Sequence, residues 1–516
     1  MTSDRCTSLS LARHACTRAR LWLLACAVVA LSAALGAAPG STSGWIHEAA
    51  AKQVPALYPG FGAAVAANDV GLVAMSSARD QDIGVDAAAV AVAALRRGRF
   101  EPAGLARHPG GRSDAGFGIS LALDDDNTLY VGAPELDGGA VFIYERAEWS
   151  RSQDGGLWQL VAELRAPSPS LAARFGASIS VWGRGQGRRL AVGEPDRDAG
   201  SQPGIDGFRA GAVHVFERGG AGWIHASMLM APQAAAAARF GTSLAIHGDT
   251  VVIGAPGAPR AVRERTLWSA GDAWCAHRVD GQWQVLQRLS APRPHALAYF
   301  GYGVGFDGVT IAITALREPM RPDSPAASAS RRGVVYLFEH AGSGWPTDST
   351  SRTAPWRPVQ RLLPPVPEDE HFASSVCVRD GMIAIGAPAA HVVAAQDHEV
   401  ASGDSRGNRG DSRERPPHRG TDFQARNPAC GATYVYEKVH ANTWIARARC
   451  TAPDANDGAR DGVDVSLARR SDGCISVVMS RGGDPEGPPG PGAVHAFTPL
   501  TMAVSAIPSK WLAGMG

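Results

Sequence analysis

Short apolar runs separated by polar turns recur along the whole chain. The pattern is clearest at residues 239–256, RFGTSLAIHGDTVVIGAP. A Phe-Gly pair precedes one apolar run (243–246), Gly248-Asp249 separates it from a second run (251–253), and Gly254-Ala255-Pro256 follows. Runs of this length bounded by Gly and Pro predict β-strands, and the proline ends the second strand because it has no N–H to donate.

Variants of this unit occur seven times. Phe-Gly opens five of them, and the pair degenerates to Phe372-Ala373 in the sixth unit and to Gly462 alone in the seventh. The five intact pairs begin at Phe61, Phe117, Phe175, Phe240 and Phe300. Asp-Gly separates the two apolar runs in three units, and it favours a tight hairpin because glycine accepts positive φ without a steric clash.

Two further strands are predicted in each unit. A third apolar run is best seen as GAVFIYER (139–146) and GAVHVFER (211–218), and a fourth run opens on an aromatic residue and often ends near Ala-Pro. One four-stranded antiparallel unit buries little apolar surface, whereas stacking the units in a ring buries both faces of each. The pattern therefore predicts an all-β protein, a seven-bladed β-propeller of four-stranded antiparallel blades.

The seventh unit, 462–497, lacks a good fourth strand. Residues 44–57, GWIHEAAAKQVPAL, precede the first Phe-Gly and resemble the fourth strand GWIHASMLMAP at 222–232. We therefore expect an N-terminal strand to complete the last blade and close the ring. Trp511 is a competing candidate for this strand, and eight blades or an open ring are the alternatives because the first and last units are degenerate.

In this order, FG, GAP and GxVYVF resemble the FG-GAP repeats of integrin α-subunit head propellers. The bacterial-type FG-GAP proteins, which have a short first turn and a Trp-containing fourth strand, are more similar still. The resemblance covers about residues 44–497. It implies a seven-bladed propeller that acts in extracellular recognition.

Many members of this family place a calcium loop between the first and second strands. Calcium binds six to eight oxygen atoms, so such a loop needs several carboxylates at alternating positions. Only Asp124-Asp125-Asp126 is rich in acidic residues here, and it lacks the later ligand positions. We interpret it as a solvated turn and expect no cofactor, with calcium as the alternative.

Residues 1–38 are typical of a signal peptide. Four arginines precede an apolar run at 21–35, and Gly36-Ala37-Ala38 offers small residues for cleavage. An uncleaved anchor is the alternative. No second apolar stretch of this length follows, so we expect no membrane span after signal removal and a secreted, periplasmic or cell-surface protein. Residues 498–516 are interpreted as a C-terminal tail.

An insertion at 391–428 separates two predicted strands of the sixth unit. It is rich in charge and poor in large apolar residues, so we expect a disordered surface loop. Its Arg409-Gly410-Asp411 resembles the RGD cell-attachment motif and is a candidate interaction site. Chance occurrence in a chain rich in Arg, Gly and Asp is the alternative.

Five of the eight cysteines lie beyond the targeting segment. Cys430 and Cys450 flank two predicted strands joined by a short turn and are expected to face each other across that hairpin, where they could form a disulfide. Buried thiols are the alternative.

Motifs for catalysis are missing from the linear sequence. Ser120, Ser178 and Ser243 follow Phe-Gly at one recurring place, which indicates a structural role for the hydroxyl and not a nucleophile. No Cys/His set has metal-ligand spacing. The net charge of +1 gives no electrostatic case for nucleic acid as a partner.

These observations predict an exported, non-enzymatic recognition or adhesion module that binds an extracellular or cell-surface protein or polysaccharide. One alternative is a hydrolase or lyase with its site at the mouth of the central channel. The other is a structural surface scaffold. Exposed aromatic and charged residues on a loop face would favour binding, whereas carboxylates or a histidine with perturbed pKa values at the channel would favour an enzyme.

Overall fold

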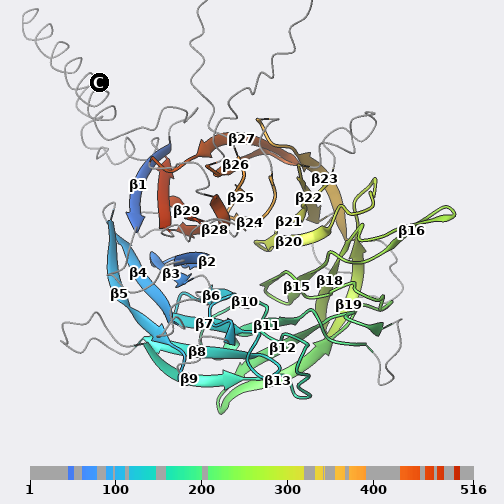
Figure 1. Ribbon diagram of the computed structural model, residues 1–516, viewed down its shortest axis with the longest axis horizontal. Coiled ribbons are helices and arrows are strands. Elements are labelled where there is room, and N and C mark those ends of the chain that lie inside the picture. The colour runs from blue at the N-terminus through green and yellow to red at the C-terminus, as the bar shows by residue number, and fades with distance from the viewer. Residues whose placement is uncertain are drawn as a thin grey trace, which may run out of the picture.

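The structure, a computed structural model, contains seven four-stranded antiparallel sheets arranged around a central axis (Figure 1). It describes residues 45–51, 61–77, 89–96, 99–110, 115–146, 158–199, 207–318, 332–340, 342, 355–366, 371–390, 430–453, 460–469, 474–481 and 493–499. The predicted all-β seven-bladed propeller is confirmed. The predicted signal peptide, the 391–428 insertion with Arg409-Gly410-Asp411, and Trp511 lie outside the described residues.

Blades 1 to 6 take their strands in chain order from the channel outward. Blades 1 to 3 consist of β2 (Phe61–Ala67), β3 (Leu72–Ser77), β4 (Ala89–Arg96) and β5 (Arg99–Arg107); β6 (Leu121–Leu123), β7 (Thr128–Ala133), β8 (Ala140–Arg146) and β9 (Trp158–Leu164); and β10 (Ser178–Trp182), β11 (Arg189–Glu194), β12 (Ala212–Gly219) and β13 (Gly222–Leu229).

Blade 4 carries an extra two-stranded ribbon, β16 (Arg260–Val262) with β17 (Arg265–Leu267), between its second and third strands. Blades 4 to 6 consist of β14 (Leu244–His247), β15 (Thr250–Ala255), β18 (Asp272–Val279) and β19 (Gln282–Leu289); β20 (Phe300–Phe306), β21 (Thr310–Ala315), β22 (Val334–His340) and β23 (Trp356–Leu362); and β24 (Val376–Arg379), β25 (Met382–Ala387), β26 (Ala432–His440) and β27 (Thr443–Cys450).

Blade 7 combines the two ends of the chain. Its sheet has the order β1-β30-β29-β28, from β1 (Trp45–Ala51), β30 (Ala493–Pro499), β29 (Ile475–Arg481) and β28 (Asp461–Arg469). Trp45 pairs with Pro499 and Ala51 with Val494. The N-terminal segment therefore supplies the fourth strand of the last blade, as its likeness to residues 222–232 predicts.

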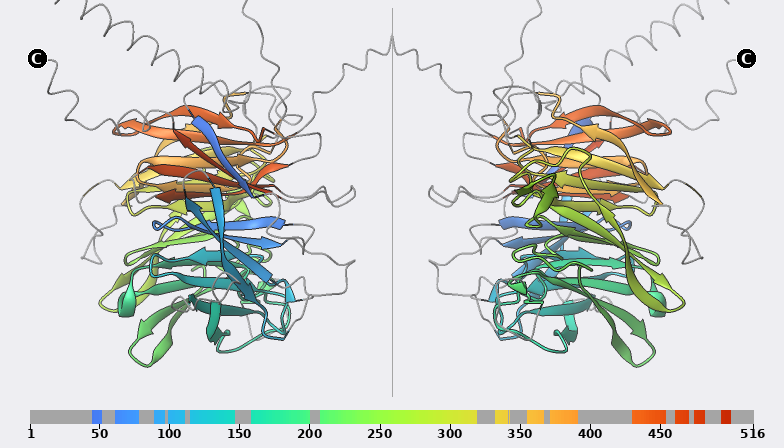
Figure 2. Two further views of the ribbon diagram at one scale, coloured as in Figure 1. Left: turned by 90° about the vertical axis from the view of Figure 1, so that its left-hand side faces the viewer. Right: turned by 90° about the vertical axis from the view of Figure 1, so that its right-hand side faces the viewer.

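Successive strands of a blade run in opposite directions, so the connections between them lie alternately on the two faces of the ring, which Figure 2 shows edge-on. The turns between first and second strands, and between third and fourth strands, lie on one face, which we call the turn face. The connections from second to third strands and from one blade to the next lie on the other, which we call the loop face. Among the described residues, no helix has the length and apolar character needed to cross a membrane.

The Phe-Gly and Gly-Ala-Pro motifs meet at the joint between neighbouring blades. The phenylalanine is fully buried at Phe175, Phe240, Phe300 and Phe372. At the joint of blades 4 and 5, a Cβ added to Gly254 would lie only 2.0 Å from the carbonyl oxygen of Gly301. Gly301 itself has a φ of +88°, a conformation that glycine adopts without strain.

The serine after Phe-Gly completes the same joint. Its hydroxyl donates a hydrogen bond to the Phe-Gly carbonyl of the next blade, from Ser120 to Gly176 (2.7 Å), from Ser178 to Gly241 (2.7 Å) and from Ser243 to Gly301 (2.9 Å). The hydroxyls therefore bind backbone carbonyls at these three joints, as the structural interpretation of these serines predicts.

The cysteine pair differs from the expected geometry. Both Cys430 and Cys450 are buried, and both are thiols that are not joined in a disulfide. The residue that pairs with Cys450 across the hairpin is Thr433, because Cys430 lies before the start of β26. Burial raises the pKa of the Cys450 thiol to about 12.

We expect a single added methyl group at the blade joint to destabilise the folded protein. Gly254→Ala should lower the free energy of unfolding by about 3 kcal/mol or more, because the methyl meets backbone that cannot move aside. The control is Ala373→Gly, at the Phe-Ala position of blade 6, where φ is +71°. There, relief of about 1–2 kcal/mol of strain offsets the lost methyl burial and the added chain entropy, so a change below about 1 kcal/mol is expected in urea unfolding. Equal effects of the two changes would contradict this account.

Blades 7 and 1 also meet through a carboxylate. Asp464 on β28 accepts hydrogen bonds from Val65 N on β2 and from Val465 N, each at 2.9 Å. Burial raises the pKa of Asp464 from 3.8 to about 6, against the lowering effect of these two bonds. The folded protein therefore holds this proton more tightly than the unfolded chain does.

This linkage predicts a pH-dependent difference between the protein and Asp464→Asn. A carboxyl group with a raised folded pKa contributes stability below its unfolded pKa and loses it as the pH rises through about 6. Between pH 4 and pH 8 the wild type should lose roughly 1–3 kcal/mol relative to the variant, whose amide does not titrate. Chemical unfolding of both proteins over this range measures the gap, and a gap independent of pH would refute the assignment.

Candidate functional site

The turns between first and second strands converge at the channel mouth on the turn face. They line a cavity of about 600 Å³. Five aspartates from four blades line it, and two arginines and one histidine lie among them; the set is Asp69, Asp124, Asp125, Arg184, His247, Asp307, Arg379 and Asp380. Sequence patterns could not place these residues together, because they lie in turns of six blades.

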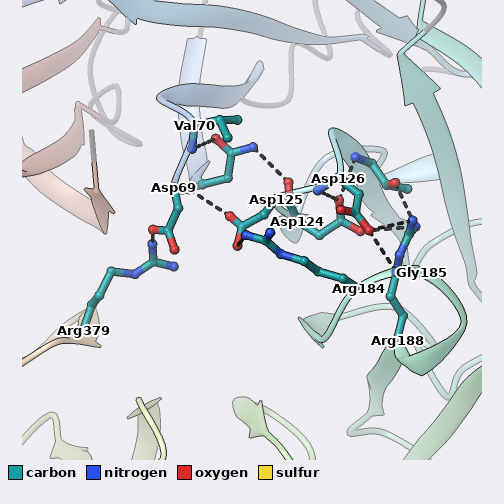
Figure 3. A network of polar contacts seen from close by, with 11 residues as sticks. Asp69, Val70, Asp124, Asp125, Asp126, Arg184, Gly185, Arg188 and Arg379 are labelled. Atoms are coloured by element: carbon teal, nitrogen blue, oxygen red, sulfur yellow. Dashed lines mark hydrogen bonds and ion pairs between the residues drawn. The ribbon is translucent and has the colours of Figure 1, made fainter. Parts of the chain in front are cut away.

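Arginine side chains link the acidic turns across the channel mouth (Figure 3). Arg379 of blade 6 forms an ion pair with Asp69 of blade 1. Arg184 of blade 3 forms one with Asp125 of blade 2 at 3.0 Å. The N–H of Asp69 also donates to the Asp125 carboxylate at 3.0 Å, so both ion pairs belong to one network.

The acidic turn 124–126 is held by a cation from the next blade. Asp124 is only 6% exposed, and it accepts hydrogen bonds from Thr128 N (2.8 Å) and the Tyr130 hydroxyl (3.0 Å). The Arg188 guanidinium lies 3.3 Å from Asp124 and 3.2 Å from Asp126. The interpretation as a solvated turn is therefore wrong for Asp124, because that side chain folds under the turn and bonds within it.

Arg188 supplies the positive charge that a calcium ion would bring to such a turn. Burial raises the pKa of Asp124, while its hydrogen bond from Thr128 and the charge of Arg188 act in the opposite direction. In the part of the chain that the structure describes, no group of three His, Cys, Asp or Glu side chains is arranged to hold a metal ion.

The carboxylates at the channel mouth are all engaged. Asp380 pairs with Arg469 at 2.7 Å, and Asp307 accepts the backbone N–H groups of Val309 and Thr310 at 3.0 and 2.8 Å. Burial raises the pKa of Asp69 and lowers that of His247. Perturbed groups therefore do gather here, but each acid is already bound by an arginine or by backbone donors, an arrangement typical of a structural clamp or a binding site.

One wall of the cavity is aromatic. The rings of Trp182 and His247 lie 5.5 Å apart, and those of His247 and Phe306 lie 5.8 Å apart. The Arg189 guanidinium is 5.7 Å from the Trp182 ring. The cavity thus combines an apolar wall with paired charges at its rim.

The loop face carries a second candidate site. Phe208 is 51% exposed and Trp268 is 67% exposed. They occupy the same position, three residues before the glycine that opens the third strand, in the neighbouring blades 3 and 4. Connections between blades support both backbones, through bonds from Ala237 N to the Phe208 carbonyl (2.7 Å) and from Leu297 N to the Trp268 carbonyl (2.8 Å).

Positive charge accompanies these aromatic side chains. The Arg209 guanidinium lies 5.1 Å from the Phe208 ring. The β16–β17 ribbon, which ends at the residue before Trp268, projects from the ring (Figure 1) and exposes Arg263, Glu264 and Arg265 at its tip, a net positive charge. The sequence analysis did not predict this surface. The available signal was an aromatic residue between the proline that follows the second strand and the glycine that precedes the third strand, present in both blades.

Comparison with known proteins identifies the repeat but no relative that defines an activity. Residues 223–265 match the model of the FG-GAP repeat family. The crystal structure of Saccharomyces cerevisiae Sqt1 is similar with 10% sequence identity, covers 89% of this chain and 99% of its own, and has a TM-score of 0.42. No curated protein matches the chain. The chain therefore carries an FG-GAP repeat in a seven-bladed β-propeller.

We expect Arg188 to be the main stabilising cation of the channel mouth. Arg188→Leu should lower the free energy of unfolding by about 3 kcal/mol, because it leaves the buried Asp124 carboxylate without its counter-charge. Arg184→Leu is the matched control: its side chain is 68% exposed, and exposed ion pairs contribute at most about 1 kcal/mol. The double variant Arg188→Leu/Asp124→Asn should recover part of the loss, and a loss unchanged by Asp124→Asn would exclude this charge pair as its cause.

Proposed function

We propose that this protein is an exported, non-enzymatic recognition module that binds a surface protein through the loop face of blades 3 and 4. The observation that carries the proposal is the exposure of Phe208 and Trp268 at one repeat position of two neighbouring blades. Aromatic and arginine side chains are enriched at the centres of protein interfaces.

The rigid support of these side chains favours binding. The backbones of Phe208 and Trp268 are hydrogen-bonded to the adjacent blade connections, so little conformational entropy is lost when a partner covers them. Arg263 and Arg265 on the projecting ribbon, with Glu264 between them, add a net positive charge to blade 4. A partner surface with apolar residues and carboxylates would complement both features.

The channel mouth gives less support to a hydrolase or lyase. A general base needs a carboxylate or imidazole that is within reach of the substrate and able to take up its proton. Four of the five aspartates at the mouth are paired with arginines, and Asp307 accepts two backbone donors. A scaffold role gives no reason for two large aromatic side chains to be exposed at the same repeat position of neighbouring blades.

The test is capture of surface components by the exported chain and by Phe208→Ala/Trp268→Ala. Loss of the aromatic pair should weaken saturable binding at least tenfold, as expected when interface hot spots are truncated. The matched control is Ile224→Ala/Leu286→Ala, which shortens residues that are 59% and 45% exposed on the outer strands of the same blades.

The control variant should bind within about twofold of the wild type, because its substitutions lie away from the loop face. Equal capture by all three proteins would reject the loop face as the binding surface. Capture of a polysaccharide in place of a protein would retain the face and change the partner. Saturable binding to neither class would favour the scaffold.

A further inference from the structure

Blade 4 holds a buried acid at a repeat position where other blades hold an apolar residue. The residue after the glycine that precedes the third strand is alanine or valine in five blades, as Ala140, Ala212, Val334, Ala432 and Ala493. In blade 4 it is Asp272, which is 1% exposed. A buried carboxylate costs free energy unless charged and hydrogen-bonding partners surround it, so the propeller fold alone gives no reason for an acid here.

Two arginines from different elements bind Asp272. Arg260, the first residue of β16, lies 3.3 Å from Oδ1, and Arg288 of β19 pairs with Oδ2. The Ser290 hydroxyl donates to Oδ1 at 2.9 Å and accepts from Arg260 Nη1 at 3.0 Å. One negative charge thus stands against two positive charges, and the cluster has an excess of one positive charge.

Both guanidinium groups reach solvent, although the carboxylate that they bind does not. The side chains of Arg260 and Arg288 are 24% and 32% exposed, whereas that of Asp272 is buried. Arg260 Nη2 and Arg288 Nη1 make no hydrogen bond to the described residues, and both have accessible surface, unlike the buried Nε atoms of the same side chains. These two nitrogens therefore have N–H groups to offer a ligand.

The two arginines line a cavity of about 500 Å³ on the loop face. The connection from blade 3 to blade 4 and the connection between β15 and β18 form its walls, and half of the lining residues are alanines. Trp274 adds an aromatic surface, and its ring lies 5.6 Å from the Arg288 guanidinium. The cavity therefore combines apolar walls with two cationic groups.

This cavity adjoins the backbone that supports the exposed aromatic pair. Ala238, which lines it, follows Ala237, whose N–H donates to the Phe208 carbonyl. Thr266, which also lines it, is two residues before Trp268. A partner surface that contacts both aromatic side chains therefore comes within reach of the cavity.

We propose that this cavity binds a glutamate side chain of the partner protein, an inference that rests on the recognition role proposed above. Because Arg260 and Arg288 bind one carboxylate between them, a second carboxylate can bridge their Nη2 and Nη1 atoms from the cavity side. Such charge-assisted hydrogen bonds are among the stronger ones in proteins. The two methylenes of the glutamate pack against the alanine methyls and the Trp274 ring.

Fastening the β16–β17 ribbon to the blade is the alternative role of the cluster. One arginine is enough to neutralise Asp272. A second guanidinium beside the first adds repulsion between like charges, and an anionic ligand offsets that repulsion, whereas the ribbon does not need it. The excess positive charge therefore favours a binding site.

The experiment is ligand-observed saturation-transfer NMR of the full chain with two blocked peptides, acetyl-Ala-Glu-Ala-amide and acetyl-Ala-Gln-Ala-amide. The glutamate peptide should bind saturably and about tenfold or more tightly than the glutamine peptide, the difference expected for hydrogen bonds to a charged acceptor. Arg260→Gln should weaken binding of the glutamate peptide by about tenfold. Arg263→Gln is the matched control: it removes the same charge from the same ribbon at an exposed position that does not line the cavity.

A second variant keeps the test independent of folding. Asp272→Asn removes the carboxylate that competes for the two arginines and raises the positive charge of the cluster. It should therefore bind the glutamate peptide several times more tightly than the wild type does. A misfolded variant would bind more weakly, so tighter binding cannot come from damage to the fold.

The proposal is overturned if the two blocked peptides bind equally or not at all, or if Arg260→Gln and Arg263→Gln weaken binding to the same extent. Binding of acetyl-Ala-Ala-Ala with a free C-terminal carboxylate, but not of the glutamate peptide, would also overturn it. Peptide binding without capture of any surface protein would support the carboxylate site and reject the recognition role. Capture that depends on Phe208 and Trp268 but is unchanged by Arg260→Gln would do the reverse.

Discussion

The close approach of two glycines, seen at four of the blade joints, is the contact on which the ring depends. The Gly-Ala-Pro glycine of one blade leaves space for the Phe-Gly carbonyl of the next, and a serine hydroxyl bonds that carbonyl. Backbone packed this closely fixes the distance and angle between sheets, so the apolar faces of the β-strands can interdigitate. The Phe-Gly and Gly-Ala-Pro motifs are therefore two halves of one joint, although about 50 residues separate them along the chain.

A joint made mainly of backbone leaves the turns and loops free to differ between blades. On the turn face, arginines bind acidic turns of the neighbouring blade and, for Arg379 and Asp69, of a blade two positions away, so the channel mouth is held by charge pairs. On the loop face, aromatic side chains extend from connections whose backbones are hydrogen-bonded in place. Blade 4 departs from the repeat in three places. It carries the β16–β17 ribbon, it has Asp272 at a position of alanine or valine, and it has His277 at the position that Glu217 occupies in blade 3.

The repeated features of the chain were predictable from its sequence, whereas contacts that occur at one place in the ring were not. Alternating apolar runs and Phe-Gly pairs sufficed for seven blades, and the likeness of residues 44–57 to 222–232 placed the N-terminal strand in the last blade. The bond from Arg188 to Asp124 was not predictable, because it joins turns 64 positions apart whose approach depends on the radius of the ring. Thr433 faces Cys450 because of a strand register that cysteine spacing does not report.

The pairing of Trp45 with Pro499 has a consequence for how the molecule is oriented when it is held. Both residues end their strands on the turn face, so the two ends of the ring leave from the same side. A tether attached at either of these two strand ends would therefore hold the ring by its turn face and leave Phe208 and Trp268 pointing away from the support. The surface that we propose for binding would then stay open to a second body while the ring is held by its opposite side.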